Sequence, residues 1–168
     1  DALRYYLLRD APFGEDGNFS EKKLVERING ELVADLGNLV YRVLTLAEKY
    51  KGKFSGKPTE KIDIKIKLIS KQMDELQITQ ALENIWQIIR NTNKYINETE
   101  PWRLRGKKLA NVLYNLLERV RIIAILLSPF LPETSERIFK QLGIKPQQLK
   151  YCKFRKFSGK IRRGNYLF

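Results

Sequence analysis

The stretch KKLANVLYNLLERVRIIAILL, residues 107–127, decides the fold class of this chain. Its apolar side chains recur at spacings of three and four residues, the period of one helix face: Leu109, Val112, Leu113, Leu116, Leu117, Val120, Ile123, Ala124 and Leu127. The dipeptide Ser128-Pro129 then ends the pattern, because proline disfavours a helical conformation in the residue before it. The stretch therefore predicts a long amphipathic helix that buries its apolar face in a helical core.

Similar patterns on both sides of this helix predict a bundle. Ser20 is a suitable N-cap for the longest further helix, although Gly30 and Gly37 weaken that helix locally. Residues 62–68 alternate as in a strand, but their length, the preceding Pro58 and the lack of a partner strand favour a helix. The predicted helices are 1–9, 20–50, 59–74, 78–97, 107–127 and 132–142. Short connections predict an all-α bundle whose neighbouring helices pack roughly antiparallel.

Three segments follow from this pattern. Residues 1–19 comprise a short helix and a loop rich in proline and glycine, and residues 20–143 form the bundle. Residues 144–168 form an irregular, basic and aromatic C-terminal tail, in which a hairpin around Ser158-Gly159 is possible.

The composition favours a basic, folded protein with a polyanionic partner. Of 168 residues, 32 are Lys or Arg and 19 are Asp or Glu, which gives a net charge of +13. Such an excess attracts nucleic acid first and an anionic membrane second, although a basic surface can also serve solubility alone. No apolar run approaches the roughly 20 residues of a membrane-spanning helix, so we expect no membrane partner. The single cysteine, Cys152, and the absence of a signal peptide lead us to expect a reducing, cytoplasmic setting.

The residue types exclude most catalytic chemistry. The chain has no histidine, which removes most zinc sites and the Ser-His-Asp and Cys-His arrangements. The sequence also has no glycine-rich phosphate loop and no nucleophile beside a base. A hydrolase built from carboxylates remains possible in principle, but Asp35 and Glu48 lie in mixed-charge helical surroundings, where carboxylates are usually solvated. We therefore expect a binding module without a catalytic residue, a metal or a cofactor.

Asn38 and Arg42 are the first candidate site. They are four residues apart on a predicted helix, so they share one face, and both carry planar hydrogen-bonding groups that match base edges. Spacing alone favours an ordinary solvated helix face.

Trp102 is the second candidate. Pro101 ends the preceding helix and delivers Trp102 at a corner, where the ring could stack on an unpaired base. The same ring could instead plug the core, as we expect of Trp86, which lies inside the apolar stripe of its helix. Three following basic residues are candidates for contacts to an RNA backbone: Arg103, Arg105 and Lys107.

Five segments, taken in order, resemble the methionyl-tRNA synthetase family from its stem-contact segment onward. They are DALRYYLLR (1–9), PFGEDGNFS (12–20), ELVADLGNLVYR (31–42), NKYI with PW (93–96 and 101–102) and LSPFLP (127–132). Related class I synthetases share the Leu-Gly-Asn and Pro-Phe-Pro-like pieces, whereas Asn-Lys-Tyr-Ile combined with Pro-Trp is specific for the methionyl type. The resemblance covers essentially the whole chain.

The resemblance implies a helical domain that binds the CAU anticodon of the methionine tRNAs, initiator and elongator. Asn38 and Arg42 would contact the first anticodon base, and Trp102 would stack on it. The ATP-dependent attachment of methionine to tRNA, with its ATP, Mg²⁺ and zinc, would belong to a catalytic domain before Asp1, so none of these cofactors is expected here. Residues 158–168 resemble the family's closing peptide, so we expect the tail 144–168 to pack back on the bundle or on that catalytic domain.

Two alternatives stay open. One is the anticodon-binding domain of another class I synthetase, of the valyl, leucyl, isoleucyl or cysteinyl type. The other is a helical protein-interaction module whose basic tail docks an acidic partner.

Overall fold

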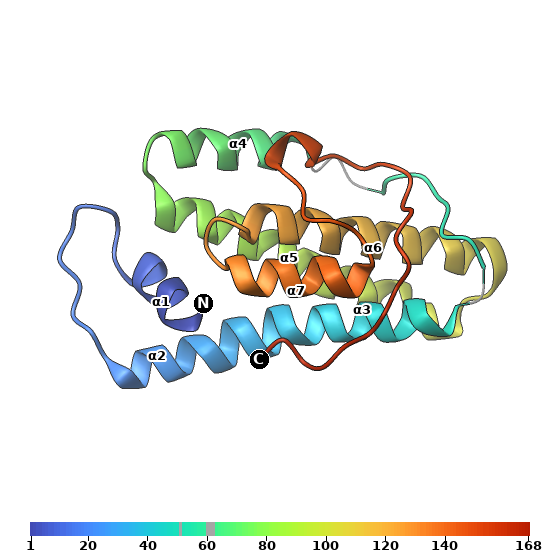
Figure 1. The fold of residues 1–168 in the computed structure, drawn as a ribbon, viewed down its shortest axis with the longest axis horizontal. Helices are drawn as coiled ribbons and strands as arrows, with labels where there is room; N and C mark the ends of the chain where they lie inside the picture. The colour runs from blue at the N-terminus through green and yellow to red at the C-terminus, as the bar shows by residue number, and fades with distance from the viewer. Residues whose placement is uncertain (51, 60–62) are drawn as a thin grey trace.

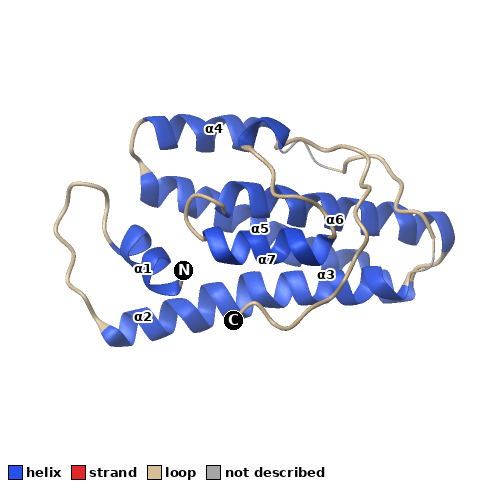
Figure 2. Cartoon of the chain, in the orientation of Figure 1, coloured by secondary structure: helices blue, strands red, loops and turns tan. Residues whose placement is uncertain are grey.

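A computed structural model describes residues 1–50, 52–59 and 63–168 (Figure 1). Its elements are α1 (Ala2–Asp10), α2 (Glu21–Arg27), the π-helical η1 (Ile28–Gly37), α3 (Asn38–Lys49), α4 (Asp63–Asp74), α5 (Ile78–Thr99), the 3-10 turn η2 (Pro101–Arg103), α6 (Gly106–Leu127), α7 (Pro132–Leu142) and the 3-10 turn η3 (Leu149–Tyr151). The described ranges contain no strand, which confirms the predicted all-α class (Figure 2). None of the helices described is both long and apolar enough to span a bilayer.

Helix α6 is the centre of the bundle, where it packs against α3, α5 and α7. Every residue from Val112 to Leu127 is buried, so this helix is covered on all sides rather than on one apolar face. The loop after α3 covers part of its polar side: Asn115 donates to the carbonyl of Lys57 and accepts from the backbone N–H of Thr59, both at 2.9 Å. The predicted helix is therefore confirmed, and its burial exceeds the prediction.

Elements α2, η1 and α3 join end to end into one long helical rod (Figure 1). Ser20 caps its start, since Oγ accepts from the N–H of Lys23 at 3.3 Å as predicted. Gly30 and Gly37 do not interrupt the rod; instead the segment that contains them is π-helical. A side chain at Gly37 would press on the rod itself, because a Cβ there would lie 3.2 Å from the carbonyl oxygen of Leu32.

The chain reverses direction at each step from α4 to α7, as predicted, but α3 and α5 run side by side in the same direction. Asp35 and Arg42 contact Asn93 and Asn97 respectively. This parallel pair arises because α4 lies between them in sequence and packs on α5 (Figure 1). The predicted helix start at Thr59 is wrong, since this residue is not helical; residues 60–62 of that prediction lie outside the described residues.

The C-terminal tail packs on the bundle as an irregular chain. The hairpin around Ser158-Gly159 is wrong, because the tail is pressed against the end of α7 rather than against itself. A Cβ at Gly159 would lie 2.1 Å from the carbonyl oxygen of Leu142, and one at Gly143 would lie 2.0 Å from that of Lys160. Gly143 also ends α7 with φ +67°, a conformation that favours glycine.

Candidate nucleic-acid interface

Asn38 and Arg42 lie on the solvent side of α3, because the residues between and beside them face inward. Leu39, Val40 and Val43 are buried in the core, whereas Asn38 is exposed and Arg42 is half-buried. Arg42 donates from Nη2 to Oδ1 of Asn97 on α5 at 2.8 Å. A guanidinium has five N–H donors, and this is the single acceptor recorded for it among the described residues, so its other donors can serve a ligand.

The start of α3 is braced from the neighbouring helix. Asn93 on α5 donates from Nδ2 to the carbonyl oxygen of Asp35 at 3.1 Å, one turn before Asn38. This bond joins the two segments that the resemblance singled out, ELVADLGNLVYR and NKYI. It holds the backbone just before Asn38 and so helps to position Asn38 on the surface of the bundle.

Trp102 lies at the far end of the same α3 face. Glu100 turns the chain with a left-handed backbone (φ 41°, ψ 58°), Pro101 is buried, and Trp102 is 48% exposed. The ring borders an open cleft of about 430 Å³ whose other lining residues are Leu46, Lys49, Tyr50, Pro101, Arg105, Gly106 and Leu109. Leu46 is one helical turn beyond Arg42, so the cleft continues the line of Asn38 and Arg42. We call Asn38, Arg42 and the Trp102 cleft the recognition strip.

The two tryptophans thus occupy opposite environments. Trp86 is fully buried, with its ring centroid 4.6 Å from that of Tyr5, which confirms the prediction of a core residue. The exposure of Trp102 leaves much of its ring open to a stacking partner.

The three residues predicted to contact an RNA backbone differ in how far their side chains are already bonded within the protein. Arg103 forms an ion pair with Glu100 at 3.0 Å. Arg105 donates from Nη1 to the carbonyl oxygens of Trp102 and Leu104, at 3.1 Å and 2.7 Å, so it stabilises the turn that carries the tryptophan. Lys107 is exposed, and the part of the chain described records no ion pair for it.

One side of the recognition strip is formed by the tail, and sequence reasoning did not predict this. Tyr166 stacks on Tyr41 with ring centroids 4.5 Å apart, and the Arg163 guanidinium lies 5.4 Å from the Tyr41 ring centroid. The hydrogen bond with Tyr166 and the charge of Arg163 lower the pKa of Tyr41. Nothing local in the sequence links these residues, which are more than a hundred positions apart. Asn97 was also missed, although it directly follows the Asn-Lys-Tyr-Ile segment.

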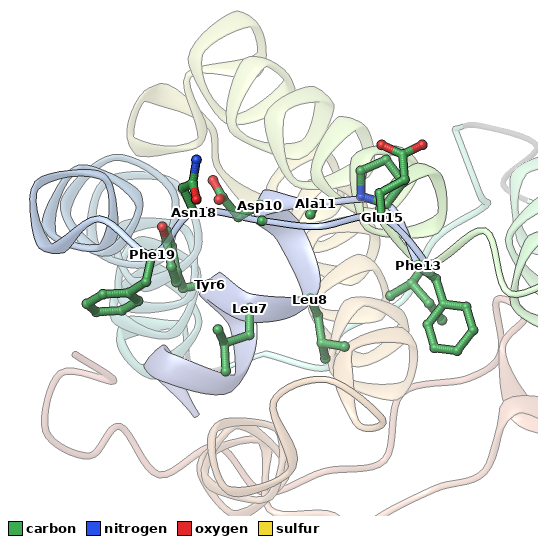
Figure 3. Close-up of a pocket in the computed structure, with 12 residues that line it drawn as sticks. Tyr6, Leu7, Leu8, Asp10, Ala11, Phe13, Glu15, Asn18 and Phe19 are labelled. Atoms are coloured by element: carbon green, nitrogen blue, oxygen red, sulfur yellow. The ribbon is translucent and has the colours of Figure 1, made fainter.

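A second cavity lies at the opposite end of the rod, between α1 and the loop that follows it (Figure 3). It has about 260 Å³, and its side chains are mostly apolar; Phe19 packs edge-on against Tyr6 at 5.7 Å. Four large apolar side chains remain exposed nearby, namely Leu3, Leu7, Phe13 and Phe19. The described residues contain no group of three His, Cys, Asp or Glu that could hold a metal ion. This end of the molecule therefore presents an apolar surface rather than a chemical site.

Comparisons with known proteins identify the family of this chain. The family described as tRNA synthetases class I (M) matches residues 1–44, and the anticodon binding domain of methionyl tRNA ligase matches residues 47–166. The methionine–tRNA ligase of Caldanaerobacter subterraneus subsp. tengcongensis is 42% identical over the whole chain, which spans 29% of that protein. That of Bacillus subtilis is 43% identical over 89% of the chain, which spans 25% of that protein.

Solved structures show the same fold. Mycobacterium tuberculosis methionyl-tRNA synthetase in complex with methionyl-adenylate matches 99% of this chain with a TM-score of 0.86 and 30% identity, and the match covers 37% of that chain. These relatives decide against another class I synthetase type and against a protein-interaction module. The chain belongs to the methionyl-tRNA synthetase family, and from residue 47 onward it matches the anticodon-binding domain of that family.

Proposed function

We propose that this domain recognises the CAU anticodon of the methionine tRNAs, initiator and elongator. The observation that carries the proposal is the recognition strip: two base-reading side chains on one face of α3, in line with a half-exposed tryptophan. Anticodon loops suit such a strip, because their unstacked bases expose their edges to hydrogen bonds and their faces to aromatic rings.

Each residue of the strip has a distinct role in this proposal. Asn38 and Arg42 bond the edge of the first anticodon base, with Arg42 held in place by Asn97. Trp102 stacks on that base. Arg105 and Lys107 approach the RNA backbone, and Arg103 joins them after leaving its exposed partner Glu100, a pair that costs little to break.

The rest of the protein would supply the chemistry. The parent reaction we propose is the ATP-dependent attachment of methionine to tRNA in the cytoplasm, with ATP, Mg²⁺ and zinc bound outside this domain. The apolar surface of α1 and its loop, which lies in the class I (M) match, would pack against that catalytic part. The chain spans 29% of its Caldanaerobacter relative, so most of that relative's length lies outside the matched region.

The test compares stem-loops that differ in the first anticodon base. Asn38→Ala and Arg42→Ala should each weaken binding to a CAU stem-loop by about 1–3 kcal/mol, the range for a lost base contact, as measured by filter binding. Both losses should be much smaller on a loop with a changed first base. Lys22→Ala on α2, where the side chain is 87% exposed, is the control for loss of one positive charge.

Two results would contradict the proposal. Equal losses on both loops would mean that Asn38 and Arg42 touch only backbone. A wild-type preference for a stem-loop with another anticodon would mean that the domain reads a different tRNA.

A further inference from the structure

We propose that a basic cleft between the end of α7 and the tail is a second binding site, for the sugar-phosphate backbone of the RNA whose anticodon lies along α3. The cleft has about 630 Å³ and is lined by five cationic side chains: Arg137, Lys140, Lys160, Arg162 and Arg163. This inference rests on the proposed function, because it takes the same RNA as the ligand.

The shape of the cleft is fixed by contacts that leave most of these cations free. Gly143 lies directly against the carbonyl of Lys160, so α7 and the tail cannot move apart without losing this packing. The backbone N–H of Arg162 donates to the carbonyl of Gln141 at 2.8 Å. Arg137 donates to the carbonyls of Leu167 and Tyr166, both at 2.6 Å. The backbone and Arg137 therefore hold the tail, and the remaining cations are not needed for this.

The cleft carries uncompensated charge. Lys140, Lys160 and Arg162 are exposed, and within the described ranges no hydrogen bond or ion pair is recorded for their side chains. Among the residues that the structure describes, no acidic side chain lines the cleft, and Glu48 approaches it through an ion pair with Arg163 at 3.5 Å. Like charges gathered in a concave surface focus the field and attract a polyanion.

The position of the cleft points to the RNA backbone. Arg163 lies at its edge and also contacts Thr45 of α3 at 3.2 Å, so the cleft adjoins the tail side of the recognition strip. Thr45 is about 10 Å along the helix from Asn38, at 1.5 Å per residue. An RNA strand with one base at Asn38 can therefore reach the cleft with phosphates a few nucleotides away.

The test uses the 168-residue chain and a triple variant, Lys140→Gln, Lys160→Gln and Arg162→Gln, which leaves the tail contacts of Arg137 intact. Binding to a CAU anticodon arm is measured across a salt series. The log–log salt slope should fall by about 2 for three lost phosphate contacts, at about 0.7 per contact. The fall should be equal on an arm with a changed anticodon, because phosphates carry no sequence. A charge-matched control, Lys22→Gln, Lys67→Gln and Lys71→Gln on α2 and α4, should leave the slope unchanged.

The outcomes separate this inference from the anticodon proposal. Equal slopes for the two triple variants would overturn the cleft site, even if Asn38→Ala still abolishes the preference for CAU. A reduced slope confined to the cleft variant would support the site, even if Asn38→Ala leaves the preference intact and the anticodon proposal fails. Thermal melting of both variants confirms that each is folded.

Discussion

Arg121 and Arg42 are the same type of side chain, but they differ in burial and in how many of their hydrogen-bond donors the protein uses. Arg121 is 1% exposed and makes five hydrogen bonds, to both carboxylate oxygens of Glu118, to Oε1 of Gln147 and to the carbonyls of Tyr151 and Lys153. Arg42 has one recorded acceptor, Asn97, among the described residues. All five donors of Arg121 are thus used within the protein, so it can only hold structure, whereas Arg42 keeps donors for a ligand.

Arg121, whose five donors are all used, explains why the tail stays on the bundle. Glu118 and Arg121 are buried on the polar side of α6, and Glu118 also accepts from the backbone N–H of Arg155 at 2.8 Å. Residues 147–155 are thereby fixed to the central helix, and residues 160–168 can reach α7 and α3. Arg121 thus acts as a clamp for the tail, whereas Arg42 keeps donors for the base contact that we propose.

The largest expected effect is on the clamp. Arg121→Met removes one partner of a buried pair and leaves the Glu118 carboxylate without its cation, so the free energy of unfolding should fall by about 3–5 kcal/mol. Urea unfolding followed by circular dichroism measures the loss. Arg42→Met, as the matched change on the strip, should stay within about 0.5 kcal/mol of wild type. Similar losses for the two variants would remove the distinction.

The two tryptophans give the next largest contrast. Trp102→Ala should weaken binding to a CAU stem-loop by about 1–3 kcal/mol, the value of a lost base–aromatic stack. Trp86→Ala should instead lower the free energy of unfolding by about 3–5 kcal/mol, because it empties a packed core site. Fluorescence titration should show quenching that depends on Trp102 alone. A large stability loss for Trp102→Ala with unchanged RNA affinity would assign that ring to packing.

A conservative change tests the base-reading role that we propose for Arg42. Arg42→Lys keeps the charge but loses the planar fork, so discrimination between CAU and a changed first base should fall by about 1 kcal/mol. The salt slope of binding should not change, because the number of cations is the same. Full discrimination by the lysine variant would show that charge alone suffices at this position.

The smallest effect concerns an acid placed between a buried and an exposed arginine. Burial alone would raise the pKa of Glu83, but the hydrogen bonds and charges of Arg9 and Arg90 outweigh it and lower that pKa. A lowered pKa contributes stability that is present above the unfolded value, about 4.3, and is lost as pH falls through the folded value. The difference in melting temperature between wild type and Glu83→Gln should thus be constant above about pH 5 and narrow in more acidic buffer. A constant difference down to pH 3 would contradict this, and Glu26→Gln serves as the exposed control.

The fold was predictable wherever local periodicity decides the structure. The apolar spacing in 107–127 predicts α6, and the stripe in 78–97 places Trp86 in the core, because helices bury one face regardless of distant contacts. Local pattern failed at Thr59 and at Ser158-Gly159, where a side chain of α6 and the end of α7 hold the backbone. Those partners come from remote parts of the chain, so the sequence around Thr59 and Ser158-Gly159 does not predict these contacts.

In the candidate site, too, local sequence predicts some features and not others. Asn38 and Arg42 share a face because of helix geometry, and their four-residue spacing is visible in the sequence. Tyr166 and Arg163 of the tail, by contrast, lie beside α3 because contacts such as those of Arg121 and Arg137 fix the tail to the folded bundle. Such contacts depend on the folded bundle, and the basic composition of the tail reveals its charge but not its place.

The π-helical segment Ile28–Gly37 makes the direction in which α3 faces depend on chain length. Each residue beyond the α-helical repeat shifts everything after it by about 100° around the rod axis. Leu32 and Leu36 point into the core, and the buried Leu39, Val40 and Val43 continue their stripe into α3, so Asn38 and Arg42 face outward. Deleting one residue here would rotate the face that carries Asn38 and Arg42 around the rod axis. The bundle would be hardly shorter, and no residue of α3 would change. Insertions and deletions in this segment would therefore change the direction in which the α3 side chains face more than substitutions would.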